Sequence, residues 1–122
     1  MKFTDLDTTE TRNESILIDL DGFTLNNGSK KVSLKGQWIK VYPTDSDTFT
    51  KAKLELQRKA VNGSEFDSNE LIASLIESWS FDEKCTIENK IVAVKIWPSK
   101  LIDLIDTTAS KRINFTVSKQ NS

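Results

Sequence analysis

The sequence predicts an α+β fold: a small antiparallel N-terminal sheet of three or four short strands, followed by four α-helices. Between residues 15 and 42, apolar residues alternate with polar ones, which is typical of strands. After residue 46, apolar residues recur at spacings of three and four, which is typical of helices. The 122 residues are enough for one domain, expected over 15–118, with a flexible tail at 1–14 and a frayed end at 119–122.

Turn-forming pairs divide the predicted sheet. Asp21-Gly22, Asn27-Gly28 and Lys35-Gly36 each follow or precede an alternating run and favour tight turns. The last run, Gln37 to Tyr42, is aromatic and β-branched and ends at a proline. Because so small a sheet is marginal alone, we expect helices to cover one of its faces.

Capping residues mark the predicted helices. The first is expected to begin within 44–47 and to end at Asn62-Gly63, and the second begins near Asp67. We expect the second to reach Trp79, because residues 71, 72, 75, 76 and 79 are apolar and share one helical face. The third opens at Thr86, and Pro98 separates it from a fourth that runs to about residue 117.

Composition and charge weigh against several classes of function. Lys plus Arg total 17 and Asp plus Glu total 18, so the basic excess of a nucleic-acid-binding protein is absent. One cysteine and no histidine exclude an internal disulfide and the usual zinc sites. No stretch approaches a membrane span and no export signal is apparent, so we expect a cytoplasmic protein that binds neither membrane nor nucleic acid.

The residues that could support catalysis are few. Asp19 and Asp21 precede a glycine as in a calcium loop, but Gly28 stands where that loop needs a glutamate. Cys85 lies just before a predicted helix N-terminus, where a thiol pKa can be lowered, but a structural role accounts for it better, because the chain has no histidine and no second cysteine. We expect no catalytic residue, no metal and no cofactor, and therefore no enzyme.

The last predicted helix is apolar over a wide arc. Ile102, Ile105, Ala109 and Ile113 form its best core stripe, and Leu104 and Phe115 align at one far edge of the arc. We take Leu104 and Phe115 as a candidate partner-binding edge. Burial of the whole arc by neighbouring helices is the alternative.

The block from 71 to 115 resembles the tail assembly chaperones of long-tailed phages. The similarity covers a little over a third of the chain: an apolar stretch ending at Trp79, the break Ser-Phe-Asp-Glu, the opening Cys-Thr-Ile-Glu-Asn, then Trp97-Pro98 and a last apolar helix. The resemblance implies a non-enzymatic factor that coats the tape measure protein and recruits tail tube subunits in the infected host cytoplasm. It also implies absence from the mature virion, and a homo-oligomer is possible.

Two other classes remain open from the sequence. A small virion component, such as a head-tail connector or tail-completion protein, would share the size, the charge balance and the lack of catalytic groups. A redox regulator acting through Cys85 is the second alternative. Purified virions would retain a connector but not a chaperone, and replacing Cys85 by serine would inactivate only the regulator.

Overall fold

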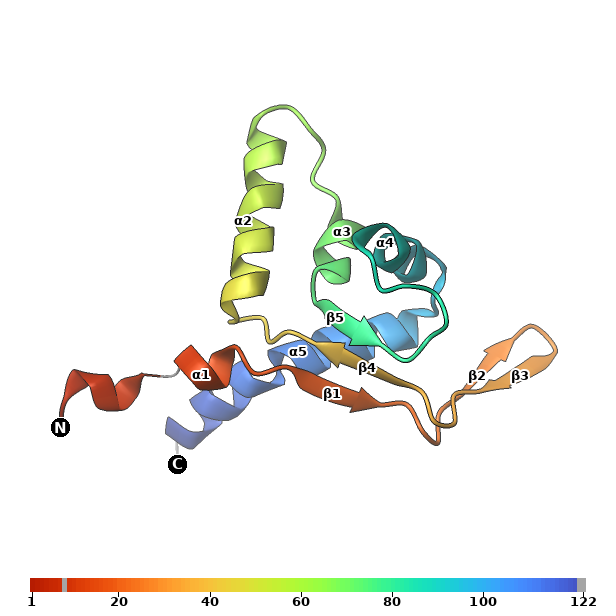
Figure 1. The fold of residues 1–122 in the computed structure, drawn as a ribbon, viewed down its shortest axis with the longest axis horizontal. Helices are drawn as coiled ribbons and strands as arrows, with labels where there is room; N and C mark the ends of the chain where they lie inside the picture. Colours follow the sequence, from red (N-terminus) through yellow and green to blue (C-terminus); the bar gives the residue numbers. More distant parts are fainter. Residues whose placement is uncertain (8, 121–122) are drawn as a thin grey trace.

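The computed structural model describes residues 1–7 and 9–120, and the side chains of 1–7 and 9–111. It confirms the α+β class: four strands precede the longer helices, and a fifth strand lies between two of them (Figure 1). The elements in chain order are a 3-10 turn η1 (Phe3–Leu6), α1 (Thr9–Arg12), β1 (Ile16–Asp19), β2 (Thr24–Asn27), β3 (Lys30–Ser33), β4 (Trp38–Val41), α2 (Asp47–Val61), α3 (Ser68–Ala73), β5 (Ile76–Trp79), α4 (Ile87–Ile96) and α5 (Ser99–Gln120).

The strands form two antiparallel sheets within the described residues. Four strands lie in the segment where three or four were predicted, and a three-stranded sheet has the order β1-β4-β5. Side chains of the central strand, β4, point alternately to the two faces of the sheet: Ile39 and Val41 are fully buried, and Lys40 between them is exposed. β2 and β3 pair only with each other and form a separate hairpin (Figure 1).

The prediction of one helix from residue 67 to Trp79 is wrong in its second half. α3 ends at Ala73, and β5 then pairs with the free edge of β4. Ile39 lies opposite Trp79 and Val41 opposite Ile76, but one residue of β5, Glu77, has no partner between them. This β-bulge brings Ile76 and Trp79 to the same buried face although they are three residues apart. Their helix-like spacing is therefore a property of a bulged strand.

The helix boundaries that depend on capping are confirmed. The Ser46 hydroxyl accepts a hydrogen bond from the Phe49 backbone N–H at 3.2 Å, and Asp67 and Thr86 cap α3 and α4 in the same way. α2 ends at Val61, Asn62 is its C-cap, and Gly63 follows with φ of 100°. These local signals lie within a few residues of the boundary that they set.

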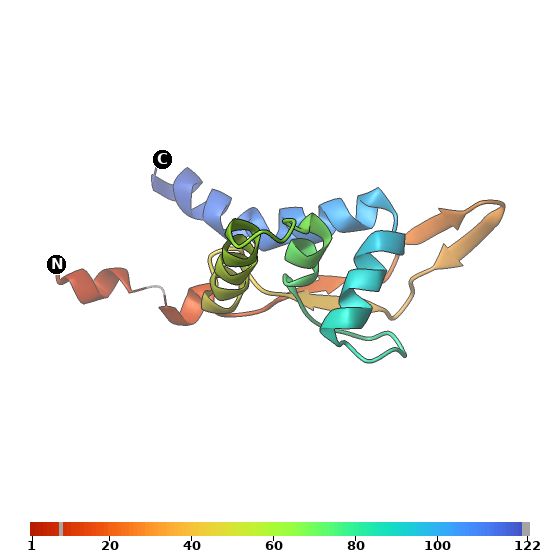
Figure 2. The same ribbon diagram turned by 90° about the horizontal axis from the view of Figure 1, so that it is seen from above.

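The long helix α5 crosses the three-stranded sheet and closes the core. It contacts β1 and β4, and Figure 2 shows it running along one side of the molecule. Ile105 and Ala109, two members of the predicted stripe, are fully buried, and Ile102 packs against the core from a half-buried position. The Thr44 backbone N–H donates to the Ala109 carbonyl at 3.0 Å and ties the end of β4 to this helix.

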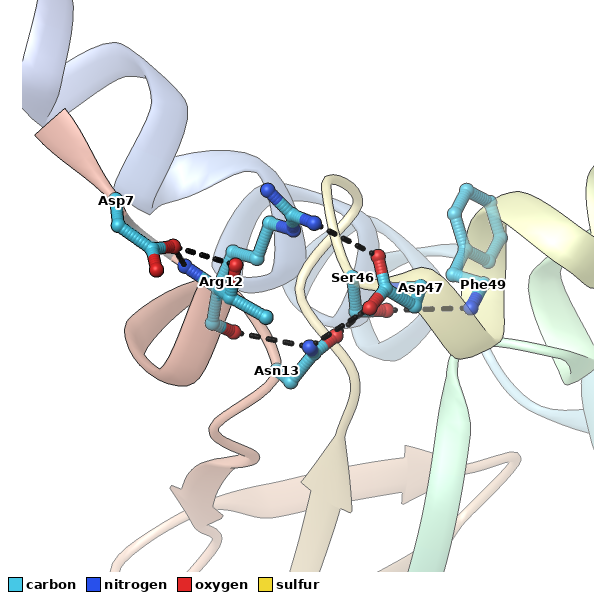
Figure 3. A network of polar contacts seen from close by, with 7 residues as sticks. Asp7, Arg12, Asn13, Ser46, Asp47 and Phe49 are labelled. Atoms are coloured by element: carbon cyan, nitrogen blue, oxygen red, sulfur yellow. Dashed lines mark hydrogen bonds and ion pairs between the residues drawn. The ribbon is translucent and has the colours of Figure 1, made fainter. Parts of the chain in front are cut away.

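The segment predicted as a flexible tail contains two helical turns and is tied to α2. Figure 3 shows the contact: the Arg12 guanidinium lies 3.2 Å from the Asp47 carboxylate, and Asn13 hydrogen-bonds to the same residue. Ahead of this attachment, η1 extends away from the rest of the molecule (Figures 1 and 2). The N-terminal segment thus has an anchored base at Arg12 and Asn13.

Candidate partner-binding surface

α4 carries apolar side chains on more sides than the core covers. Ala93 and Val94 are buried in the core, whereas Val92 is 53% exposed and Ile96 is 73% exposed. These two side chains are four residues apart and therefore lie on one face of the helix. A surface helix normally exposes its polar face, so the exposed apolar face makes α4 a candidate surface for a partner.

Three aromatic rings adjoin this face. Trp79 ends β5, Phe81 follows in the next loop, and Trp97 comes directly after α4. Their ring centroids are 5.7–5.8 Å apart in all three pairs, with interplanar angles of 57–66°. Edge-to-face geometry of this kind adds about 0.5–1.5 kcal/mol per pair beyond the area buried. The three rings therefore pack against one another as a cluster beside the exposed face of α4.

Two hydrogen bonds hold the loop that precedes α4. The Trp79 indole N–H donates to the Glu83 carbonyl at 2.7 Å, and the Asn89 side-chain amide donates to the Lys84 carbonyl at 2.8 Å. Pro98 fixes the turn after Trp97 because its ring restricts the backbone. The position of the aromatic cluster is thus set from both ends of α4.

A cavity of about 170 Å³ opens between the rings and α4. We call the cavity and the exposed α4 face together the α4 pocket. A space of this size suits one aromatic or branched aliphatic side chain. Its lining residues are Trp79, Phe81, Glu83, Asn89, Val92, Ala93, Ile96 and Trp97.

The partner-binding edge predicted on α5, Leu104 and Phe115, is not part of the α4 pocket. Leu104 is half-buried and packs against the core, so it is less exposed than the groove wall that the sequence predicted, and its role at a partner edge stays a prediction. The side chain of Phe115 lies outside the described residues. The apolar arc of α5 is wider than one core-facing stripe because α5 crosses the sheet and contacts both β1 and β4.

The residues considered for catalysis do not assemble into a site. Asp21 accepts a hydrogen bond from the Gly36 backbone N–H, and Asp19 accepts one from the Asp21 backbone N–H, so both carboxylates stabilise turns. Burial raises the pKa of the Cys85 thiol, with Lys90 opposing the shift, which is contrary to the lowering expected beside a helix N-terminus.

The described residues contain no cluster of three or more His, Cys, Asp or Glu side chains that could hold a metal ion. Within the same part of the chain, no helix combines the length and the apolar character needed to cross a membrane.

The sequence interpretation missed Val92 and Ile96, because it considered only the face formed by residues 87, 91 and 94. The available signal was that α4 is apolar outside that face as well. Comparison with protein-family models, with curated proteins and with solved structures gives no match for this chain.

Proposed function

We propose that this protein is a non-enzymatic tail assembly chaperone of a long-tailed phage. It binds the tape measure protein and recruits tail tube subunits during tail morphogenesis, in the cytoplasm of the infected host, and leaves before the virion matures. The observation that carries the binding function is the α4 pocket, in which the exposed apolar face of α4 adjoins the cavity. The phage context comes from the sequence resemblance.

Some features of the resembling block, residues 71–115, keep their expected secondary structure and others do not. The opening at Thr86 caps α4 and Trp97-Pro98 forms the turn before α5, so the order of these two features is retained. The apolar stretch ending at Trp79 is a strand at its end instead of a helix. Three parts of the resembling block line the α4 pocket: Phe81, Asn89 at the start of α4, and Trp97. These parts therefore lie close together in the fold.

The chemistry of the pocket suits an apolar helical partner. A helix presenting large side chains at spacings of three and four could place one in the cavity and others along Val92 and Ile96. Aromatic anchors in such pockets supply much of the affinity of small interfaces. Contacts of this size are weak enough individually for tube subunits to displace the chaperone.

The test co-expresses the protein with the tape measure protein of the same phage and measures how much tape measure protein stays soluble and co-purifies. We expect V92Q/I96Q to lose at least tenfold in recovered complex. The matched control is L54Q/V61Q, which replaces two exposed apolar residues of α2. Glutamine keeps helix propensity in both pairs.

Two results would contradict the proposal. Equal recovery with both double variants would show that the α4 pocket is not the binding surface. Failure of the wild-type protein to solubilise the tape measure protein, or its retention in purified virions, would favour a structural virion component instead.

A further inference from the structure

Two Asn-Gly pairs, Asn27-Gly28 and Asn62-Gly63, lie at the surface of the molecule, and all four residues are exposed. Such a pair is chemically labile, because glycine has no Cβ to hinder the approach of its backbone nitrogen to the asparagine side chain. The two pairs are identical as sequence, so the fold decides which of them reacts.

The end of α2 holds the second pair in place. The Gly63 backbone N–H donates to the Ala60 carbonyl at 3.2 Å. The next N–H, that of Ser64, donates to the Lys59 carbonyl at 3.0 Å. These are the two hydrogen bonds of a Schellman motif, so the Gly63 nitrogen cannot approach the Asn62 side chain unless the end of the helix opens.

The first pair lies in the β2–β3 hairpin and is not held in this way. Gly28 and Ser29 form a two-residue turn, closed by the pairing of Asn27 with Lys30. None of the described residues accepts a hydrogen bond from the Gly28 backbone N–H. The hairpin is a two-stranded sheet with every residue of β3 exposed, so it opens locally at little cost. Local opening lets the Asn27 backbone rotate until its side chain faces the Gly28 nitrogen.

We propose that Asn27 is a site of spontaneous deamidation, with water as the co-reactant. The Gly28 backbone nitrogen attacks the side-chain carbonyl carbon of Asn27, the bond from that carbon to the amide nitrogen breaks, and the displaced N–H proton leaves with the amide as ammonia. One water molecule then opens the resulting succinimide ring at either of its two carbonyl carbons. The products are aspartate and isoaspartate, and nothing is oxidised or reduced.

The charges around the turn favour this reaction. Residues 22–36 contain three lysines and no acidic residue, and Lys30 is the cross-strand partner of Asn27. Positive charge there stabilises the negative charge that develops on the Gly28 nitrogen during the attack. The last turn of α2 is basic as well, so charge does not separate the two pairs. The hydrogen bonds at Gly63 do.

The two products change the hairpin differently. Aspartate keeps the backbone and adds a negative charge opposite Lys30. Isoaspartate carries the backbone through its side chain and adds one backbone atom before Gly28, which breaks the register of the hairpin. The hairpin projects from the rest of the molecule (Figure 1), and none of its residues lines the α4 pocket. Deamidation therefore proceeds whether or not that pocket binds a tape measure protein.

The experiment incubates the folded full-length protein at mildly alkaline pH in water labelled with heavy oxygen. The protein is then digested with trypsin in ordinary water, so only deamidation before digestion carries the label. Peptides 13–30 and 60–84 contain the two pairs and are analysed by mass spectrometry with fragmentation. We expect Asn27 to react about tenfold faster than Asn62 in the folded protein, with one heavy oxygen per event. In urea, where neither pair is held by structure, the two rates should become alike.

N27Q and N26Q are the matched variants. Glutamine has one more methylene and would have to close a six-membered ring, which forms far more slowly, so N27Q should keep peptide 13–30 unmodified. N26Q leaves the reacting pair intact and should react like the wild type. N27D serves as the reference for the aspartate product: it should keep the NMR contact between Leu25 and Val32, and the purified isoaspartate form should lose it.

Four results would overturn the proposal. They are an Asn62 that reacts as fast as Asn27 in the folded protein, a rate ratio that urea leaves unchanged, an N27Q peptide modified as fast as that of the wild type, and an isoaspartate form that retains the hairpin.

Discussion

Asn13 and Asp47 hydrogen-bond to each other in both directions across 34 positions of sequence. The Asn13 side-chain amide donates to the Asp47 carboxylate at 3.0 Å, and the Asp47 backbone N–H donates to the Asn13 side-chain oxygen at 2.7 Å (Figure 3). Asp47 is the first residue of α2, so a side chain from the N-terminal segment satisfies one of the free N–H groups of that helix.

The first prediction concerns the acidity of Asp47. The hydrogen bond from Asn13, assisted by Arg12, lowers the Asp47 pKa below its ordinary value of 3.8. Replacing Asn13 by alanine should raise the Asp47 pKa toward that value, as read from the carboxyl carbon shift by NMR. N26A, in the hairpin, is the control. An unchanged Asp47 pKa in N13A would contradict the contact.

The same shift predicts the sign of a pH dependence. A carboxylate with a lowered folded-state pKa stabilises the fold above its unfolded-state pKa, and this contribution is lost as pH falls through the folded-state pKa. The stability difference between wild type and N13A should therefore shrink below about pH 4. It should not vanish, because the bond from the Asp47 backbone N–H does not titrate.

The second prediction tests β5 as a strand. The Tyr42 backbone N–H donates to the Leu75 carbonyl at 2.7 Å, and the Ser80 backbone N–H donates to the Trp38 carbonyl at 3.1 Å. Carbon chemical shifts of residues 76–79 should be those of a strand, and these two amides should exchange slowly with solvent. Helical shifts through Trp79 would restore the sequence-based interpretation.

The third prediction concerns Trp79, which is 9% exposed and contacts both other rings of the cluster. Replacing it by alanine should cost about 3–5 kcal/mol of unfolding free energy, measured by denaturant titration. F66A removes an aromatic ring that is 44% exposed and serves as the control. A loss in W79A no larger than that in F66A would contradict the burial of Trp79 in the core.

The fourth prediction separates Leu104 from the exposed leucine Leu54. Leu104 packs against the core from a half-buried position, so L104S should cost about 1–2 kcal/mol, while L54S should stay within about 0.5 kcal/mol. Both changes lie inside long helices, so the difference in helix propensity cancels. An L104S as stable as L54S would return Leu104 to the candidate partner edge.

The fifth prediction concerns Cys85. Because burial raises the pKa of its thiol, alkylation by iodoacetamide should be slower at neutral pH than for the same protein in urea. C85S should keep the partner binding of the wild type. Fast alkylation of the folded protein, or loss of binding in C85S, would support the redox alternative.

Elements whose boundaries depend on residues close by in the sequence could be predicted, and elements that depend on distant residues could not. The boundaries of α2 and α4 follow from Ser46, Asn62 and Thr86, each of which acts on backbone groups within a few residues. β5 could not be recognised in the same way, because its pairing with β4 is decided some 40 residues away. Periodicity alone also favoured a helix, since the bulge at Glu77 gives Ile76 and Trp79 a spacing of three.

The candidate site was harder still to predict. Trp79, Phe81 and Trp97 were visible as aromatic residues, but they meet only because β5 and α4 end at the same place. Leu104 looked exposed because a single helix drawn by itself does not show how many elements α5 crosses. Val92 and Ile96 could have been identified, since α4 has more apolar residues than one core-facing stripe requires.

The β2–β3 hairpin bears on how the protein unfolds. It is a two-stranded sheet apart from the main one, with every residue of β3 exposed, and isolated pairs of strands are barely stable in water. The amides near the Asn27-Gly28 tip should therefore exchange through local opening, long before those of β4. Unfolding will not be a single two-state event in every probe: signals from the hairpin will fall first, and those from the aromatic cluster will report the cooperative loss of the core.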